Sequence, residues 1–589
     1  MIETLPFTRA ALHAAYREGV TPADVVAETY RRIAAADDPA IFICLRDIAE
    51  VQAEAAALPG DPATHPLWGL PFVVKDNIDV GGMTTTAACP AYAYEAERDA
   101  FVVARLRVAG ALLIGKTNLD QFATGLVGVR SPYGVPRNAL DPEIVPGGSS
   151  SGSAVAVGLG LAAFSLGTDT AGSGRVPAAL NGIVGLKPSL GALSATGVVP
   201  ACRTLDTISV FAASVADAYA AYDIACAYDP ADAFSREIVA GAPGPVPAGL
   251  RIGVPSRETR KFFGDEAQAA MFEAALARLA GQGAVIREID FTPFYDVAEM
   301  LYEGAWVAER YAVVEALMEA DPEALLPTTA GIIGAARRLS AADAFRGMYR
   351  LKDLARTAGA ALGALDLLCV PSIPTFYTRA DLEADPVTPN SNLGTYTNFV
   401  NLLDLCAIAV PTEPRADGRP GSVTLIAPSG QDALAASVAQ LFEAAPALPL
   451  GPRPAPETFR IAVCGAHMRG LPLNHELTSR GARFLQTART APQYRLYALA
   501  GGPPARPGLL RIEKGAAIDL EIWALPETAL GGFLAGVPAP LTIGTITLEN
   551  GAEVHGFLVE AAGVQGAEDI THLGGWRRFL EGRAGVAAP

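Results

Sequence analysis

Up to about residue 445 the chain alternates short apolar runs with longer alanine-rich stretches of helical spacing. Short apolar runs bounded by turn residues are typical of buried strands, and the alanine-rich stretches favour helices. This alternation predicts an α/β sheet covered by helices on both faces. The clearest strands are expected at 72–74, 112–114, 252–254 and 367–370, and the clearest helices at 268–279 and 342–355.

The pattern changes after a proline-rich segment, which predicts a domain boundary. Closely spaced prolines cannot sustain a helix or a central strand, so residues 446–457 are expected to form a semi-rigid linker between domains at 1–445 and 458–589. Short strands separated by Gly and Pro turns follow, as in a small β-rich α+β domain. These strands are expected at 460–464, 495–500, 518–524, 541–548 and 554–560.

Composition narrows the classes of function. The 589 residues suffice for two or three domains, and the net charge of −17 argues against nucleic-acid or anionic-membrane partners. The seven cysteines form no CxxC pair or disulfide framework, which favours small buried thiols in a reducing compartment. With no signal-like N-terminus and no apolar run long enough to span a bilayer, a cytoplasmic protein is expected.

Two glycine-serine runs and one lysine are candidates for chemistry. The sequence GGSSSG spans 147–152, and Ser173 lies in DTAGSGR, 24 positions after Ser149. A flexible linker is the plain alternative for the first run, but the following apolar stretch, 153–164, is of helix length and must be buried. A nucleophile elbow at Ser150 would need a histidine as base, and none occurs between His65 and His467.

Lys75 can supply the missing base. It follows the apolar run 70–74, which predicts a buried strand, and burial lowers the pKa of a lysine by disfavouring its charged form. A neutral amine can then accept a proton as general base. Ser173 lies between two glycines, so the backbone can approach a substrate closely there.

Lys75, GGSSSG and DTAGSGR, in this order and spacing, resemble the amidase signature family over roughly residues 5–440. The resemblance implies that family's fold, a mixed central sheet covered by helices. It implies Ser173 as nucleophile, Ser149 after a cis peptide as proton relay, and Lys75 as base. It further implies an oxyanion hole of backbone N–H groups, with Asp169 and Arg175 locking the loop. Those N–H groups belong to Thr170, Ala171, Gly172 and Ser173.

Two further stretches resemble the allophanate hydrolases within that family. The first is GTDTAGSGRVPA at 167–178, and the second is AVCGAHMRGLPLNHEL at 462–477, which resembles the start of their C-terminal domain. That domain is similar in fold to gamma-glutamyl cyclotransferases. The resemblance implies hydrolysis of allophanate, urea-1-carboxylate, to ammonia and N-carboxycarbamate, which breaks down to carbon dioxide and a second ammonia. This hydrolysis is expected to require no metal, nucleotide or organic cofactor.

The resemblance also implies which residues recognise this small anion. Tyr302 and Arg310 match the substrate-recognition positions, eight apart and hence two turns along one side of a helix, and Gly125 is expected to offer a backbone contact. An arginine can bind a carboxylate through two parallel hydrogen bonds. In the C-terminal domain His475 is the expected base for decarboxylation, with His467 as its neighbour; the alternative is an assembly module without chemistry.

Alternatives for the whole protein are a broad-specificity amidase and the catalytic subunit of an amidotransferase complex, which would need glutamine, ATP and partner subunits. A homodimer acting on a small molecule is expected. The chain shows no Met-Lys-Met biotin context and no Gly-rich ATP loop. The enzyme that makes allophanate, a urea carboxylase or a biuret-forming pathway, is therefore expected to be a separate protein.

Overall fold

The structure is a computed structural model that describes residues 2–246, 249–443 and 458–584. The chain divides into two compact units, of which one holds residues up to 238 and resumes at 251. The other holds the chain after the undescribed stretch together with 239–250, which the sequence pattern does not predict. The linker expected at 446–457 lies outside the described residues, so the boundaries at 445 and 458 stay predictions.

An eleven-stranded mixed sheet forms the first unit, in the order β1-β5-β2-β6-β8-β7-β12-β13-β11-β9-β10. β2 runs parallel to β5 and β6, whereas β8, β7 and β12 pair antiparallel. All four strands expected from the apolar runs are present, which confirms the predicted class. The strands are β1 Phe42–Leu45, β2 Pro71–Lys75, β5 Leu112–Thr117, β6 Phe164–Asp169, β7 Val184–Lys187, β8 Thr207–Ala212, β9 Arg251–Pro255, β10 Val285–Ile289, β11 Leu367–Pro371, β12 Leu405–Pro411 and β13 Ser422–Pro428, beside a hairpin of β3 Thr84–Thr85 and β4 Tyr94–Glu95.

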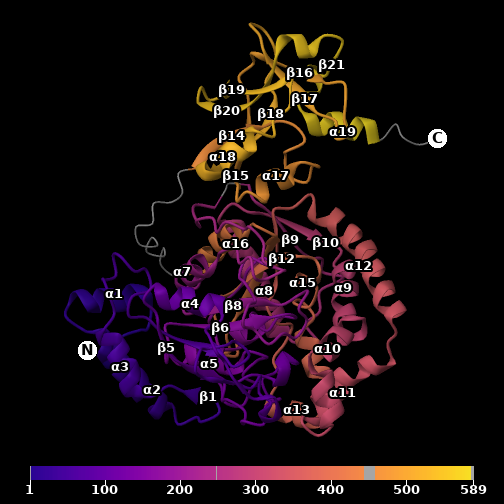
Figure 1. The fold of residues 1–589 in the computed structure, drawn as a ribbon. Helices are drawn as coiled ribbons and strands as arrows, with labels where there is room; N and C mark the ends of the chain where they lie inside the picture. The colour runs from indigo at the N-terminus through magenta and orange to yellow at the C-terminus, as the bar shows by residue number, and fades with distance from the viewer. Residues whose placement is uncertain (1, 247–248, 444–457, 585–589) are drawn as a thin grey trace. The chain divides into compact units, whose positions relative to one another are not determined.

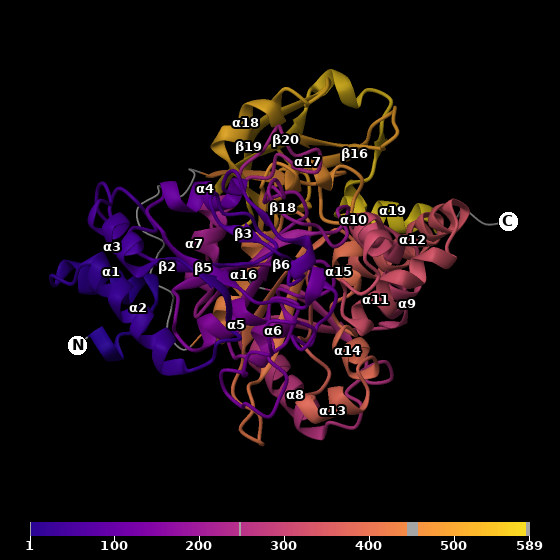
Figure 2. The same ribbon diagram turned by 60° about the horizontal axis from the view of Figure 1, so that its bottom comes forward.

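Helices cover both sides of the central strands. α5 and α6 pack on one another and on the strands, while α7 packs with α4 and α16, and Figure 1 shows the strands between these two groups. α1–α3 lie at the opposite side of the unit from α9–α12 in both views (Figures 1 and 2). The helices are α1 Arg9–Arg17, α2 Pro22–Ala36, α3 Ile48–Ala56, α4 Phe101–Val108, α5 Ser151–Gly158, α6 Val176–Leu180, α7 Val215–Ala225, α8 Glu266–Gly281, α9 Thr292–Glu303, α10 Trp306–Ala320, α11 Pro327–Gly334, α12 Ala341–Leu362, α13 Arg379–Ala384, α14 Thr388–Leu393, α15 Phe399–Leu402 and α16 Asp432–Ala439.

One expected helix-length stretch has a different form. The residues 153–164 begin within α5, which ends at Gly158, pass through the exposed Leu159 and enter β6 at Phe164. A fully apolar run shows no periodicity that separates a buried helix from a buried strand. Because the chain changes from helix to strand here, the serine runs GGSSSG and DTAGSGR lie at the same region of the sheet.

The second unit is β-rich, as predicted. Its five-stranded sheet has the order β15-β18-β14-β20-β19, and a three-stranded sheet has the order β17-β16-β21. Among the helices of the described chain, none is long and apolar enough to cross a bilayer. The elements are β14 Thr458–Val463, α17 Asn474–Thr478, β15 Arg483–Arg489, β16 Tyr494–Ala498, β17 Pro507–Arg511, β18 Asp519–Pro526, α18 Glu527–Leu534, β19 Leu541–Thr547, β20 Glu553–Val559, β21 Glu568–Asp569 and α19 Trp576–Ala584.

Candidate active site

Lys75 is the last residue of β2 and is fully buried. Its Nζ lies 2.7 Å from Oγ of Ser149 and 2.7 Å from Oγ1 of Thr168. Burial lowers the pKa of Lys75 to about 7, against the opposing effect of nearby carboxylates. Near neutral pH a large fraction of Lys75 is therefore an uncharged amine within hydrogen-bonding distance of Ser149.

Ser149 is held at the start of α5 by its backbone. The Gly148–Ser149 peptide bond is cis, which confirms the expectation from the family resemblance. The carbonyl of Ser149 accepts a hydrogen bond of 3.0 Å from the backbone N–H of Asp120, and a side chain at position 148 would collide with the Asp120 carboxylate. These contacts aim the Ser149 hydroxyl at Lys75.

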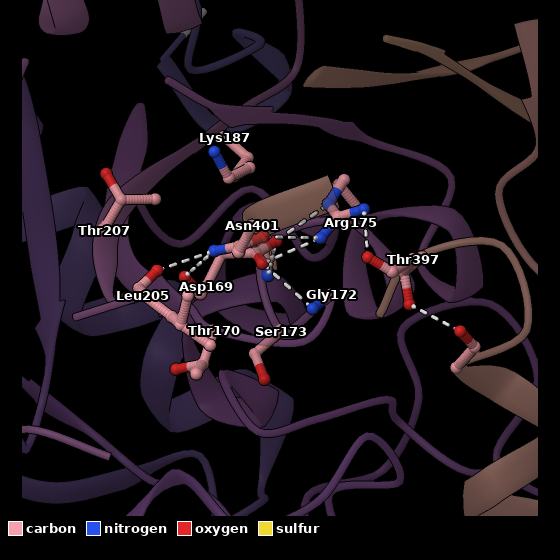
Figure 3. A network of polar contacts seen from close by, with 12 residues as sticks. Asp169, Thr170, Gly172, Ser173, Arg175, Lys187, Leu205, Thr207, Thr397 and Asn401 are labelled. Carbon is pink, nitrogen blue, oxygen red and sulfur yellow. Dashed lines mark hydrogen bonds and ion pairs between the residues drawn. The ribbon is translucent and has the colours of Figure 1, made fainter. Parts of the chain in front are cut away.

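A buried ion pair fixes the loop between β6 and α6 (Figure 3). The carboxylate of Asp169 accepts hydrogen bonds of 2.9 Å from Nε and a terminal nitrogen of Arg175, and further bonds from the backbone N–H groups of Gly172 and Gly174. Burial raises the pKa of Asp169, but the Arg175 guanidinium, Lys187 and the backbone N–H of Gly174 together more than offset that effect and keep the carboxyl ionised. The side chain of Asn401 donates to the Asp169 carbonyl at 2.8 Å. The loop lock expected from Asp169 and Arg175 is thus present.

Ser173 lies on the far side of this loop from the ion pair. Its hydroxyl points away from the Asp169–Arg175 pair, toward the same side as the Thr170 hydroxyl (Figure 3). Oγ of Ser173 lies 3.5 Å from the carbonyl oxygen of Gly125, which brings the predicted Gly125 into the site. Within the described chain the Ser173 hydroxyl makes no hydrogen bond to Ser149, so proton relay requires a closer approach of the two serines.

Three of the four predicted oxyanion-hole donors are available. Within the described residues the backbone N–H groups of Thr170, Ala171 and Ser173 make no hydrogen bond, whereas that of Gly172 donates to the Asp169 carboxylate at 2.9 Å. Gly172 has φ of +131°, a conformation that favours glycine, and it turns its N–H toward the ion pair. Gly172 therefore shapes the loop, and the other three groups are free to bind a developing oxyanion.

Tyr302 and Arg310 do not share one helix, contrary to the prediction. Tyr302 belongs to α9 and Arg310 to α10, and the helices are separated at Gly304, whose backbone is extended. A glycine weakens a helix because it gains conformational freedom when the helix opens. The two side chains still meet, because the Arg310 guanidinium carbon lies 5.2 Å from the centre of the Tyr302 ring.

Arg310 is a buried cation with unused donors. One terminal nitrogen lies 3.2 Å from Oγ1 of Thr124 and 3.4 Å from the carbonyl of Ala123. Its Nε and its other terminal nitrogen have no partner, nor does the hydroxyl of Tyr302, and in the described part of the chain no carboxylate lies within ion-pair distance of Arg310. Buried charges in proteins are usually paired, so this group of donors fits an anion.

Comparisons with known proteins agree with this geometry. Residues 24–435 match the family model described as Amidase, and residues 459–581 match the model described as Allophanate hydrolase C-terminal domain. The chain belongs to the amidase family. The family resemblance inferred from the serine runs is thereby confirmed.

Individual relatives match one or both domains of this amidase. Urea amidolyase of Saccharomyces cerevisiae is 42% identical over 88% of the chain, but the chain spans only 30% of the length of that protein. The structure of Kluyveromyces lactis allophanate hydrolase is 39% identical with a TM-score of 0.73, covering 98% of this chain and 99% of the other. The structure of native peptide amidase from Stenotrophomonas maltophilia is 27% identical with a TM-score of 0.63, covering 76% of this chain and 98% of the other.

The two candidate histidines of the C-terminal domain have different surroundings. His467 is mostly buried, stacks on Phe557 with ring centres 5.0 Å apart, and its Nε2 lies 3.0 Å from Oε2 of Glu476. Burial lowers the pKa of His467. His475 is exposed, with Nδ1 2.8 Å from the carbonyl of Pro472. His467 lines a pocket of the second unit together with Glu476 and Phe557, and the catalytic roles expected of the two histidines stay predictions.

The amidase site contains residues that the sequence did not single out. Thr168 contacts Lys75, Thr124 contacts Arg310, and the buried Asp120 lies beneath the cis peptide. The carboxyl of Asp206 accepts a short hydrogen bond from the Thr170 hydroxyl, and burial raises the pKa of Asp206 to about 6. Their positions in the sequence give little signal: Thr168 lies near the end of β6, Asp206 directly precedes β8, and Asp120 and Thr124 lie in the loop after β5.

Proposed function

We propose that this amidase hydrolyses allophanate to ammonia and N-carboxycarbamate. The observation that carries the proposal is the buried Arg310, whose unpartnered donors and the Tyr302 hydroxyl form an anion receptor in the same site as Lys75 and the two serines. Allophanate has a carboxylate for that receptor and a terminal amide for the nucleophile. The similarity over both domains to a structure named allophanate hydrolase supports the same substrate.

In the proposed mechanism Ser173 attacks the terminal amide carbonyl while its proton passes to Ser149 and the Ser149 proton passes to neutral Lys75. Backbone N–H groups of Thr170, Ala171 and Ser173 bind the oxyanion; in enzymes generally one such donor contributes about 3 kcal/mol. Ammonia leaves with the proton held by Lys75. Water then attacks the acyl-enzyme by the same relay and releases N-carboxycarbamate.

A neutral amide would leave the receptor unfilled. The unused nitrogens of Arg310 are buried, and a buried polar group without a partner costs about 1–3 kcal/mol. A carboxylate substrate removes that cost, whereas a neutral substrate does not. Specificity for a carboxylated amide over a plain aliphatic amide follows from this difference. It is also why we favour allophanate over the alternative of a broad-specificity amidase.

The test compares Arg310→Met on two substrates. We expect kcat/KM for allophanate to fall about 100-fold, since two charged hydrogen bonds together contribute about 3 kcal/mol. Hydrolysis of propionamide should change less than about threefold, because that substrate presents no carboxylate. Arg338→Met removes an exposed arginine and is the matched control. Equal losses on both substrates would contradict a carboxylate receptor at Arg310.

We further propose that the pocket around His467 assists decarboxylation of N-carboxycarbamate. The support is chemical, since a buried imidazole whose Nε2 faces a carboxylate oxygen at 3.0 Å is oriented for proton transfer. The alternative role for this domain is assembly of a homodimer without chemistry. We propose that a urea carboxylase or a biuret-forming pathway supplies the allophanate.

A pair of variants tests this role. His467→Ala should leave release of the first ammonia unchanged and slow the appearance of carbon dioxide, whereas His475→Ala should affect neither product, because His475 is exposed and outside the pocket. Both products can be followed by coupled assays at the same enzyme concentration. Unaltered carbon dioxide release in His467→Ala, with dimerisation lost on truncation at the linker, would favour the assembly role.

A further inference from the structure

Asp120 is a fully buried carboxylate directly behind the catalytic groups, in the loop that follows β5. Its carboxylate accepts hydrogen bonds from the backbone N–H groups of Gly128 at 3.0 Å and Arg130 at 2.8 Å. In the described residues no lysine or arginine side-chain nitrogen lies within 4 Å of it, so Asp120 is not half of an ordinary ion pair. A buried carboxylate without a cation is costly unless its surroundings need it.

The contacts of Asp120 connect separate parts of the site. Its two carboxylate bonds close the segment 120–130 into a loop, and its own backbone N–H donates to the carbonyl of Ser149 at 3.0 Å. The closed loop presents the hydroxyl of Thr124 to Arg310 and the carbonyl of Gly125 to Ser173. The anion receptor, the nucleophile and the relay serine are therefore held relative to one another through this one residue, by its carboxylate and its backbone N–H.

The same carboxylate leaves no room for side chains at two glycines. A Cβ on Gly125 or on Gly148 would collide with Oδ2 of Asp120. The carboxylate thus lies against the backbone on both sides of the space in which Ser149 and Ser173 must exchange a proton. Its place in the loop is set by close packing as well as by hydrogen bonds.

The charge of Asp120 acts on Lys75. The charged groups that face Lys75 from neighbouring elements are Asp120 after β5, Asp206 before β8, Asp169 at the end of β6 and Arg310 on α10. Among the carboxylates Asp120 has the largest effect in raising the pKa of Lys75. Burial raises the pKa of Asp120 itself, and the charge of Arg130, the two backbone N–H donors and Lys75 oppose that effect.

We propose that Asp120 is a positioning residue that holds the 120–130 loop against Ser149 and provides the fixed negative charge facing Lys75 when Lys75 takes up its proton. In that step the Oγ–H bond of Ser173 breaks as its oxygen bonds to the substrate carbonyl carbon, and the relayed proton ends on Nζ. The new ammonium forms in a water-poor site, where a fixed carboxylate stabilises it. The proposal rests on the catalytic roles of Lys75, Ser149 and Ser173 given above, but not on the identity of the substrate.

The test is the pH dependence of kcat/KM in Asp120→Asn, measured with whichever amide the wild type hydrolyses, allophanate or propionamide. Loss of the charge should move the acid limb of the profile down by about one pH unit, because Lys75 then loses its proton at lower pH. The plateau should fall at least about tenfold, because a less basic amine is a poorer proton acceptor. If the wild type hydrolyses propionamide but not allophanate, the proposed function is contradicted. The pH dependence of Asp120→Asn can still be measured with propionamide.

Asp432→Asn is the matched control. Asp432 is also a buried carboxylate in the first unit and accepts two hydrogen bonds from Ser189, at 2.8 and 2.7 Å, but it is not among the groups facing Lys75. Its substitution should leave the acid limb where it is. A lower plateau with an unmoved acid limb in Asp120→Asn would overturn the proposal, since that result describes a purely structural residue.

A second variant covers the case in which Asp120→Asn does not fold, since an amide nitrogen would face one of the two N–H donors. Asp120→Glu keeps the negative charge while displacing it. Its acid limb should stay within about half a pH unit of wild type, although its plateau falls. A downward shift of a full unit in this charge-conserving variant would contradict the proposed role of the charge.

Discussion

Two cations, Lys75 and Arg310, lie buried in the same site, and across the described chain neither has a carboxylate within ion-pair distance. Their side-chain chemistry gives them opposite roles. An amine can lose its proton when buried, whereas a guanidinium stays charged. Lys75 is therefore suited to the proposed role of proton acceptor, and Arg310 keeps a positive charge that suits the proposed role of anion receptor.

The pKa of Lys75 predicts how activity depends on pH. Because only the neutral amine accepts a proton, kcat/KM should rise about tenfold per pH unit below the pKa of about 7 and level off above it. Lys75→Arg, which cannot become neutral, should abolish turnover across the range. Lys261→Arg changes an exposed lysine and should leave the profile unaltered. Activity that keeps rising from pH 8 to pH 10 would show that Lys75 titrates as an ordinary exposed lysine.

Sequence analysis predicted some residues of the site and missed the contacts of others. Lys75 could be predicted because an apolar run ends at it and the family resemblance expects a lysine there. The contacts of Asp120 and Thr168 could not, since they depend on which strands become neighbours in the sheet. The sequence did not reveal that His467 lines a pocket and that His475 is exposed, and the preference for His475 as a base stays a prediction.

At the scale of elements, the site is built where strands end and helices begin. Lys75 ends β2, Asp169 ends β6, Ser149 lies two residues before α5, and Ser173 lies three residues before α6. Parallel β2, β5 and β6 bring these ends to one edge of the sheet. The apolar runs predicted β2 and β5, but they did not separate α5 from β6 or α9 from α10. In the second case Gly304 was the available signal.

The Asp169–Arg175 pair predicts a large effect of one substitution on the element that carries the nucleophile. Arg175→Met leaves the fully buried Asp169 carboxylate without its cation, which in proteins costs about 3–5 kcal/mol. We expect a clearly lower midpoint of thermal unfolding and loss of turnover. Arg346→Met breaks an exposed pair with Asp343, worth under about 1 kcal/mol, and is the control.

A double variant separates stability from positioning. Asp169→Asn together with Arg175→Met removes the stranded charge, so much of the thermal stability should return. Turnover should not, because the N–H groups of Gly172 and Gly174 then lack a charged acceptor to fix the loop. Recovery of activity together with stability would contradict a role for the ion pair in shaping the nucleophile loop.

At the scale of the whole molecule, two compact units share one chain, and the second also takes in residues 239–250 from within the first domain's sequence. Such a long-range association leaves no local pattern, which is why sequence analysis did not find it. The chain matches nearly the full length of Kluyveromyces lactis allophanate hydrolase. By contrast, it spans under a third of the length of Saccharomyces cerevisiae urea amidolyase.

The most direct test of the central claim is ammonia released by the purified full chain from allophanate, beside malonamate, biuret and propionamide, without ATP or glutamine. Ser173→Ala is the blank. We predict rapid release from allophanate, slow release from propionamide, and none above background from the Ser173→Ala variant. Release from propionamide as fast as from allophanate, or dependence on added ATP and glutamine, would contradict a carboxylate-selecting hydrolase.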